Sequence, residues 1–148
     1  MRAARKRPKL LEYVHGDMHI DDMHIAMNAL FPIAAIREGL PPEAADAPVS
    51  AGRLTAAELD RLAIPRKTLA HRRALGRLTP EQSDRLARIL RVIGTAEEVF
   101  GDPGRAHVWL RRPTSALDGE APLELLDTDP GARQVEALLG RIAHGIAA

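Results

Sequence analysis

The sequence predicts an all-α fold, and two features of its composition and patterning support this prediction. Aromatic residues make up only 3% of the 148 residues, whereas apolar residues make up 45%. A core built mostly from aliphatic side chains favours helices, because strands prefer β-branched and aromatic residues. Apolar residues also recur at the spacing i, i+3, i+4, i+7, which is typical of one buried helical face.

The N-terminal segment divides into an arm and a helical stretch. Residues 1–22 predict a flexible basic arm, since residues 1–9 carry five Lys or Arg and no acid. Residues 23–38 predict a helix, which Pro32 either kinks or restarts. Its expected apolar stripe consists of Ile25, Ala29, Ile33 and Ile36.

The stretch that follows is expected to be irregular. Residues 41–53 contain three prolines and end in Ser50-Ala51-Gly52. Proline, serine and glycine in such a cluster are typical of loops. We therefore expect residues 41–53 to form the most loop-like stretch inside the chain.

A helix-turn-helix is predicted directly after this loop. Thr55 is suited to cap a short helix that runs to about Leu62, and a second helix is expected from Pro65 or Arg66 to Leu75. Two short helices joined by a tight turn, the second of them basic, are typical of this motif. The side chains expected in the core are Leu59, Leu62, Ile64 and Leu69.

The second of these helices is the candidate DNA-reading helix. Residues 61–77 carry six Lys or Arg and no acid. Arginine can bind guanine edges in a bidentate way, and Lys and Thr can hold phosphates. The candidate DNA-binding residues, all expected to be free to meet DNA, are Arg66, Lys67, Thr68, His71, Arg72 and Arg73. The alternative is a solvated basic face, and Ala63 stands where many such motifs have Gly.

A long helix is predicted in the middle of the chain. Thr79 and Gln82 have capping-box spacing, and Pro80 occupies the first helical position. The buried face is expected to hold Leu86, Ile89, Leu90 and Ile93. Residues 95–100 either continue this helix beyond Gly94 or begin another.

Two further helices are expected towards the C-terminal end. After a turn at residues 101–104, a helix from Pro103 to Arg111 is expected to bury Ala106, Trp109 and Leu110, with Trp109 as a core anchor. Residues 112–131 mix turn residues with short apolar pieces. The last helix is expected to begin near Asp129 and to bury Val135, Leu138, Leu139 and Ile142.

A family resemblance rests on residues 78–145. The relevant runs are Leu78-Thr79-Pro80-Glu81-Gln82-Ser83-Asp84-Arg85-Leu86, Ala96-Glu97-Glu98-Val99-Phe100-Gly101-Asp102, Trp109-Leu110, Arg112-Pro113, Ala116 to Thr128, Gly131 to Glu136 and Leu138 to Gly145. This series closely resembles the Xre/ParS/MbcA antitoxins, the partners of RES-domain toxins. The similarity is weaker in residues 54–77 and weakest in residues 1–53.

The resemblance implies a fold, a partner and a mechanism. It implies an all-α chain with a Cro-like helix-turn-helix region at residues 23–94 and a small helical toxin-binding domain at residues 95–148. It implies a homodimer that neutralises an NAD-consuming RES-domain toxin by covering its active-site cleft, and that binds operator DNA to repress its own operon. Residues 114–148 carry six acids against two Arg, which suits a positively lined cleft.

The resemblance, read beside the local chemistry, also gives candidate toxin-binding residues. Asp127 and Thr128 could instead simply cap the last helix, and Arg133 could pair with Asp127, with Asp129 or with the toxin. The candidates are Arg112, Pro113, Leu117, Gly119, Pro122, Leu125, Asp127, Thr128, Arg133, Val135, His144, Gly145 and Ile146.

Other function classes find little support in the sequence. The chain has no cysteine, which excludes disulfides and a Cys nucleophile and fits a cytoplasmic location. His15, His19 and His24 lie near acids but match no metal-site spacing, so we expect no metal. The sequence shows neither a Ser–His triad signal nor a Gly-rich phosphate loop, so we expect no cofactor and no enzymatic activity. No apolar run reaches the roughly 18 residues of a membrane span. The alternative function is a stand-alone DNA-binding transcriptional regulator without a toxin.

Overall fold

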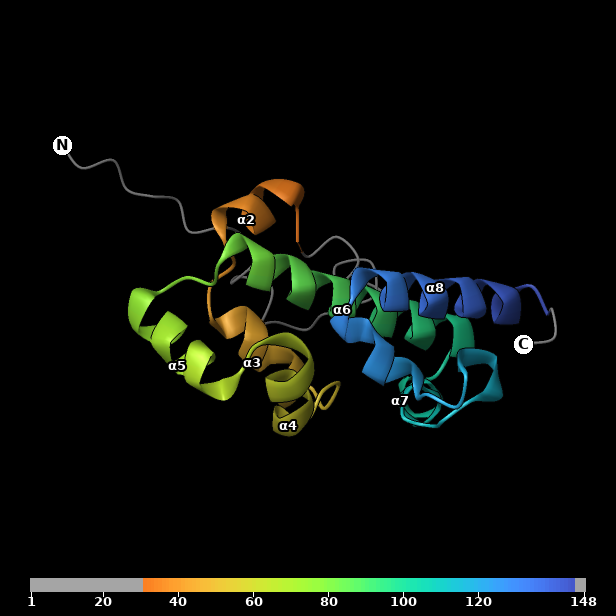
Figure 1. Ribbon diagram of the computed structural model, residues 1–148. Coiled ribbons are helices and arrows are strands. Elements are labelled where there is room, and N and C mark those ends of the chain that lie inside the picture. Colours follow the sequence, from red (N-terminus) through yellow and green to blue (C-terminus); the bar gives the residue numbers. More distant parts are fainter. Residues whose placement is uncertain (1–30, 146–148) are drawn as a thin grey trace.

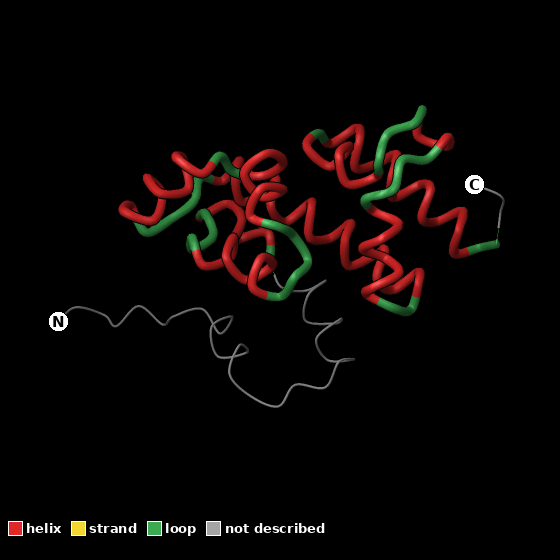
Figure 2. Tube along the Cα trace, turned by 90° about the horizontal axis from the view of Figure 1, so that it is seen from below, coloured by secondary structure: helices red, strands yellow, loops and turns green. Residues whose placement is uncertain are grey.

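The computed structural model describes residues 31–145, and in this part of the chain every regular element is a helix. Figure 2 shows the same trace as helices joined by loops, without a strand. The predicted all-α fold is confirmed. The arm expected at residues 1–22, the apolar positions Ile25 and Ala29, and the candidate residue Ile146 lie outside the described residues.

The helices follow one another with short connections (Figure 1). In chain order they are α2 (Ile33–Glu38), α3 (Glu43–Ser50), α4 (Ala56–Glu58), the π-helix η2 (Leu59–Ala63), α5 (Arg66–Leu75), α6 (Pro80–Phe100), α7 (Pro103–Leu110), the 3₁₀-helices η3 (Ser115–Leu117) and η4 (Pro122–Asp127), and α8 (Asp129–Ala143). No helix in this described part is long and apolar enough to cross a membrane.

Much of the fold packs on the long helix α6. Its start is the predicted capping box, in which Thr79 accepts from the Gln82 backbone N–H and the Gln82 side chain accepts from that of Thr79. Its buried face includes Leu86, Ile89 and Ile93, all fully buried. Helices α2, α7 and α8 and the short helices η2 and η4 all contact α6.

Helix α6 also runs through the expected boundary between the two regions at residues 94 and 95. Gly94 is buried, and the helix continues to Phe100 before Gly101 ends it in the left-handed conformation. Of the two possibilities for residues 95–100, continuation is therefore the one observed. In Figure 1, α3, α4 and α5 lie around one end of α6, and α7 and α8 lie along the other.

The expectation of a loop at residues 41–53 is wrong, because α3 occupies most of that stretch. Pro42 takes the N-cap position with φ −57°, where a missing N–H costs nothing. Pro48 lies near the other end of a helix of only 8 residues. Ala45 and Pro48 are buried, so tertiary packing stabilises a helix that composition alone disfavours.

Of the apolar stripe expected on residues 23–38, only Ile33 and Ile36 lie within the described residues, and neither is buried. Within the described residues the helix begins at Ile33, with Pro32 as its N-cap. Ile33 is 69% exposed, and α2 has no buried residue. Gly39 ends α2 at φ +91°, and a Cβ there would lie 2.2 Å from the Leu78 carbonyl oxygen, so only glycine fits.

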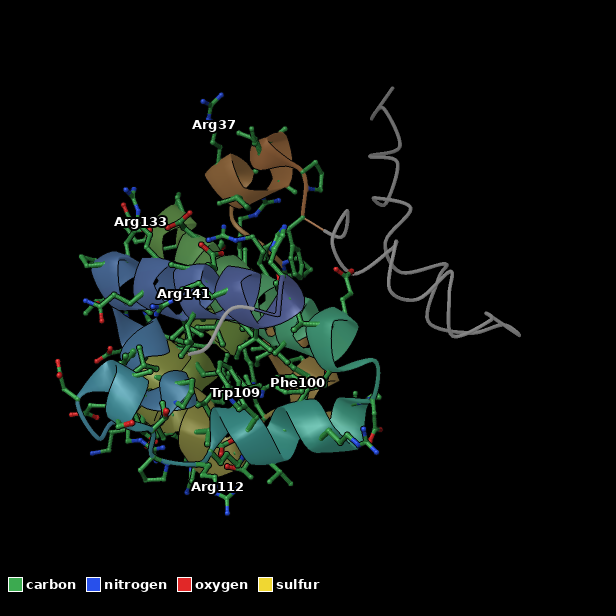
Figure 3. All side chains as sticks on the ribbon, turned by 90° about the vertical axis from the view of Figure 1, so that its right-hand side faces the viewer. Arg37, Phe100, Trp109, Arg112, Arg133 and Arg141 are labelled. Atoms are coloured by element: carbon green, nitrogen blue, oxygen red, sulfur yellow. The ribbon has the colours of Figure 1, made fainter. Side chains whose placement is uncertain are left out.

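Trp109 is half-buried, whereas the sequence led us to expect it in the core. The neighbouring Ala106 and Leu110 are buried as expected. Trp109 packs against Phe100, with ring centroids 5.4 Å apart. Figure 3 shows the two aromatic side chains from α6 and α7 pointing towards each other beneath α8. The predicted stripe of α8 is confirmed for Val135, Leu138 and Leu139, while Ile142 is half-buried.

The start of α8 is fixed by a cap and a close backbone contact. Thr128 accepts a hydrogen bond from the Gly131 backbone N–H at 3.1 Å. Gly131 is buried, and a Cβ at this position would lie 2.0 Å from the Leu125 carbonyl oxygen. Because that oxygen belongs to the backbone of η4, it cannot rotate out of the way.

We therefore predict that Gly131→Ala lowers the free energy of unfolding by about 1–3 kcal/mol, as overpacking against backbone does. Gly140→Ala in the same helix is the matched control. A Cβ at Gly140 has open space around it, so that variant should be neutral or more stable by up to about 1 kcal/mol. Urea unfolding curves measure both, and equal stabilities would contradict the prediction.

Candidate functional site

The helix-turn-helix forms much as predicted. Thr55 caps α4, as expected. It does so in a capping box with Glu58, and the part of Glu58 was not predicted. The chain continues as η2, passes through Ile64 in an extended conformation and enters α5 after Pro65. Gly76 ends α5 in the left-handed conformation. All four predicted core residues of the motif are buried, namely Leu59, Leu62, Ile64 and Leu69.

The six candidate DNA-binding residues do not share one surface of α5. Lys67 and His71 are exposed and stand one turn apart, on the side away from buried Leu69. Thr68 and Arg72 are half-buried on a flank of the helix, and the Arg72 Nε–H has no hydrogen-bond partner within residues 31–145. The outward surface is therefore less cationic than the sequence suggests.

Arg66 and Arg73 are exposed on the flank of α5 that faces the preceding helices. The Arg73 guanidinium donates two hydrogen bonds of 2.6 Å to the Asp46 carboxylate on α3. Asp60, on η2, accepts a hydrogen bond from the Arg66 backbone N–H. The expectation that Arg73 is free is therefore wrong. Sequence reasoning missed Asp46 because it lies in the stretch that was expected to be a loop.

The candidate toxin-binding residues fall into three classes of exposure. Leu117, Pro122 and Val135 are buried, so they can act on a partner only by supporting the fold. Leu125 is half-buried. The exposed ones are Arg112, Pro113, Gly119, Asp127, Thr128, Arg133, His144 and Gly145.

Several of these exposed residues already have partners within the chain. Arg133 pairs with Asp129 at 2.9 Å, one of the alternatives left open by the sequence. The His144 Nδ1 lies 2.7 Å from the Gly140 carbonyl oxygen at the end of α8. Figure 3 shows Arg112 and Arg133 pointing away from the molecule on opposite sides. One flat interface could not use both arginines.

A buried ionic cluster joins the helix-turn-helix to the C-terminal helices, and sequence reasoning did not anticipate it. Arg53 donates to both oxygens of Glu97 at 3.0 and 2.9 Å, and the two residues are only 6% and 5% exposed. The Nε2 of His107, on α7, lies 2.8 Å from Glu97 Oε1. One carboxylate on α6 thereby holds the segment before α4 and the helix α7.

A second ion pair lies beside the first. Arg111, at the end of α7, donates to both oxygens of Glu58 at 2.7 and 2.8 Å. The same guanidinium donates to the Arg53 carbonyl oxygen at 3.2 Å, which links the two pairs. Glu58 also accepts from the Thr55 backbone N–H, so one carboxylate both caps α4 and binds α7.

The electrostatics of both carboxylates follow from these contacts. Burial alone would raise the pKa of Glu97, but hydrogen bonds from Arg53 and His107 outweigh burial and lower the pKa below its usual value. The pKa of Glu58 is likewise lowered, because the hydrogen bonds from Arg111 and Thr55 exceed the effect of burial. Both groups are therefore ionised at neutral pH.

Metal chemistry gains no support from the described residues. No group of three or more His, Asp or Glu side chains within residues 31–145 is arranged to hold a metal ion. His15, His19 and His24 lie outside this part of the chain.

Two domain models match the chain. Residues 31–91 match the antitoxin Xre-like helix-turn-helix domain. Residues 95–145 match the antitoxin Xre/MbcA/ParS C-terminal toxin-binding domain. Together the two models cover nearly all of residues 31–145, with the helix-turn-helix domain before the toxin-binding domain. The chain belongs to the Xre/MbcA/ParS antitoxin family. The buried ionic cluster accordingly joins the two family domains.

Curated relatives support the same family. The chain is 44% identical over 85 residues to an Antitoxin Xre of Yersinia enterocolitica, covering 56% of this chain and 57% of that relative. It is 41% identical over 95 residues to an Antitoxin Xre of Pseudomonas putida, covering 64% and 59%. It is 31% identical over 77 residues to a Prs ADP-ribosylating antitoxin of Sphingobium, covering 46% and 48%. The chain spans about half the length of the curated relatives it matches.

We predict that Glu97→Gln lowers the free energy of unfolding by about 3–5 kcal/mol at neutral pH, because it leaves the buried Arg53 without a counter-charge. Glu136→Gln is the control. It removes a carboxylate of similar type from the more exposed Arg91 pair and should cost about 1 kcal/mol or less. Equal losses of unfolding free energy in the two variants, measured with urea, would show that the buried pair stabilises the fold no more than the exposed pair does.

The same variant has a pH signature. A carboxylate whose pKa is lowered by folding stabilises the fold above its unfolded pKa and loses that contribution as the pH falls through its folded pKa. The stability difference between wild type and Glu97→Gln should therefore shrink as the pH falls below about 4.5, the usual Glu value. A difference that is constant down to pH 3 would contradict this mechanism.

Proposed function

We propose that this protein is an antitoxin that neutralises an NAD-consuming toxin through residues 95–148 and represses its own operon through the helix-turn-helix. The observation that carries the proposal is the ordered match of two antitoxin domains across residues 31–145. The proposed action is binding and occlusion rather than catalysis. The proposed setting is the cytoplasm, where such a toxin meets its substrate.

The arrangement of the helices supports two separate binding surfaces. Helix α5 and the C-terminal end of α8 lie at opposite ends of the molecule (Figure 1). A partner on one surface therefore leaves the other accessible. A homodimer would present two copies of α5 to a duplex, as helix-turn-helix proteins commonly do, and we include a homodimer in the proposal.

The toxin is proposed to be of the RES class, which the resemblance implies. The name of the Sphingobium relative connects that antitoxin with ADP-ribosylation. An ADP-ribosyl group is taken from NAD, so a RES-class toxin and an ADP-ribosylating toxin would consume the same cofactor. The proposed inhibitory element is the end of α8 with His144 and Gly145, which are exposed and follow the last packed turn.

We predict that a chain ending at Ala143 loses neutralisation when it is co-expressed with the protein of the adjacent reading frame. This truncation keeps α8, which ends at Ala143, whereas ending at Leu139 would also remove half-buried Ile142. The measurements are growth, the cellular NAD pool and ADP-ribose on cell proteins. NAD loss alone indicates a RES-type toxin, and ADP-ribosylated protein indicates an ADP-ribosylating toxin.

Normal growth and a normal NAD pool with the truncated chain would contradict the inhibitory role proposed for residues 144–148. The control is the variant Lys67→Ala/His71→Ala, which alters only the exposed surface of α5 and should neutralise the toxin fully. A loss of neutralisation in this control would indicate a general folding defect.

We further predict that Lys67→Ala/His71→Ala weakens binding to DNA from upstream of the operon and lowers the salt slope by about one unit, since Lys67 is the exposed cation of the outward surface of α5. The matched control is Arg141→Ala at the other end of the molecule, which should bind normally. Unchanged affinity of the double variant would favour a helix-turn-helix that serves only dimerisation.

The alternative is a DNA-binding regulator without a toxin. It is favoured by the well-formed helix-turn-helix and its buried core. The match of residues 95–145 to a toxin-binding domain weighs against it. A pull-down with the adjacent protein separates the two functions.

A further inference from the structure

The ion pair between Asp46 and Arg73 engages one of the six side chains that the sequence predicts to be free to meet DNA. Both guanidinium Nη atoms lie 2.6 Å from the two oxygens of the carboxylate. The Arg73 side chain is 47% exposed and the Asp46 side chain 42%, so the pair lies at the surface of the helix-turn-helix rather than in its core. A solvent-exposed guanidinium is thereby matched by a carboxylate of the same chain.

A carboxylate and a phosphate use the same part of an arginine. Asp46 takes the end of the fork formed by Nη1 and Nη2, so a phosphate is left with the Nε edge and meets the negative charge of the carboxylate beside it. The hydrogen bond from Arg73 lowers the pKa of Asp46, which keeps the carboxylate charged at neutral pH. Asp46 therefore competes with a phosphate under ordinary conditions.

The position of Arg73 on α5 makes this competition relevant to DNA. Arg73 follows buried Leu69 by one turn and stands on the exposed flank of α5 that faces α3. A flanking arginine of this kind reaches the phosphate backbone beside a helix that enters the groove. When Arg73 binds Asp46, it is turned back towards α3 instead.

We propose that Asp46 is an intramolecular competitor that holds Arg73 away from the DNA backbone and so lowers the DNA affinity of the helix-turn-helix. This proposal rests on the proposed DNA binding and deepens it. In the described structure α5 presents one phosphate contact fewer than its sequence provides. Exchange of Arg73 from the carboxylate to a phosphate restores that contact at the cost of an exposed ion pair.

A purely structural role for the pair gives a different expectation. An exposed ion pair contributes about 1 kcal/mol or less to stability, so its removal should barely affect folding. If the pair only joined α3 to α5, removal of the Asp46 charge would leave DNA affinity unchanged apart from the general effect of one negative charge fewer. The two roles are therefore separated by DNA binding.

The experiment compares Asp46→Asn with Glu43→Gln. Both substitutions remove one negative charge from α3, but Glu43 is exposed and makes no hydrogen bond to Arg73. The probes are a duplex from directly upstream of the reading frame and a scrambled duplex of equal length. Affinity is measured across a series of salt concentrations, and a thermal melt by circular dichroism checks that both variants fold.

We expect Asp46→Asn to bind both duplexes about three- to tenfold more tightly than Glu43→Gln, with a salt slope steeper by about one unit. A gain on both duplexes is expected because a phosphate contact carries no sequence information. In an Arg73→Gln background the gain from Asp46→Asn should disappear. A gain that persists without Arg73 would overturn the proposal.

The outcomes also separate this proposal from the function on which it rests. If wild type binds the upstream duplex and Asp46→Asn binds no more tightly than Glu43→Gln, the competitor role of Asp46 is refuted while DNA binding stands. If neither wild type nor Asp46→Asn binds either duplex, both the DNA-binding function and the competitor role are refuted.

Discussion

The Glu97 carboxylate on α6, held by Arg53 and His107, is the contact that fixes how the two halves of the molecule stand to each other. Removing a carboxylate and a guanidinium from water is expensive, and only close, complete hydrogen bonding offsets that expense. Arg53 supplies this hydrogen bonding, because its Nε and Nη2 donate to the two Glu97 oxygens at 3.0 and 2.9 Å. Such a pair tolerates little displacement, so it sets a single register between the helix-turn-helix and α7.

This register gives the two proposed binding surfaces a fixed geometry. Helix α6 belongs to both family domains, since one match ends at residue 91 and the other begins at residue 95 within the same helix. A continuous helix resists bending, and the ionic cluster stops the flanking helices from rotating about it. The proposed toxin and DNA surfaces therefore lie at two ends of one continuous helix, with the ionic cluster between them.

The features that were predictable from sequence are local ones. Thr79 and Gln82 stand three residues apart, and the stripe on α8 repeats with the helical period, so short windows contain the whole signal. The helix α3 and the Asp46–Arg73 pair were missed because both depend on packing between segments far apart in the sequence. The burial of Leu117 and Pro122 was missed for a related reason: a family resemblance locates a segment but does not say which of its side chains face inwards.

Glu58 caps the first helix of the helix-turn-helix and also receives Arg111 from the C-terminal domain, and this double use bears on how such chains can evolve. The two domains match separate models, yet their interface charges must be inherited together. Recombination between relatives preserves the fold only where the incoming C-terminal half supplies an acid at Glu97 and an arginine at Arg111. An incoming half without these partners would leave Arg53 or Glu58 as an unpaired buried charge, so we expect the two domains to be exchanged together.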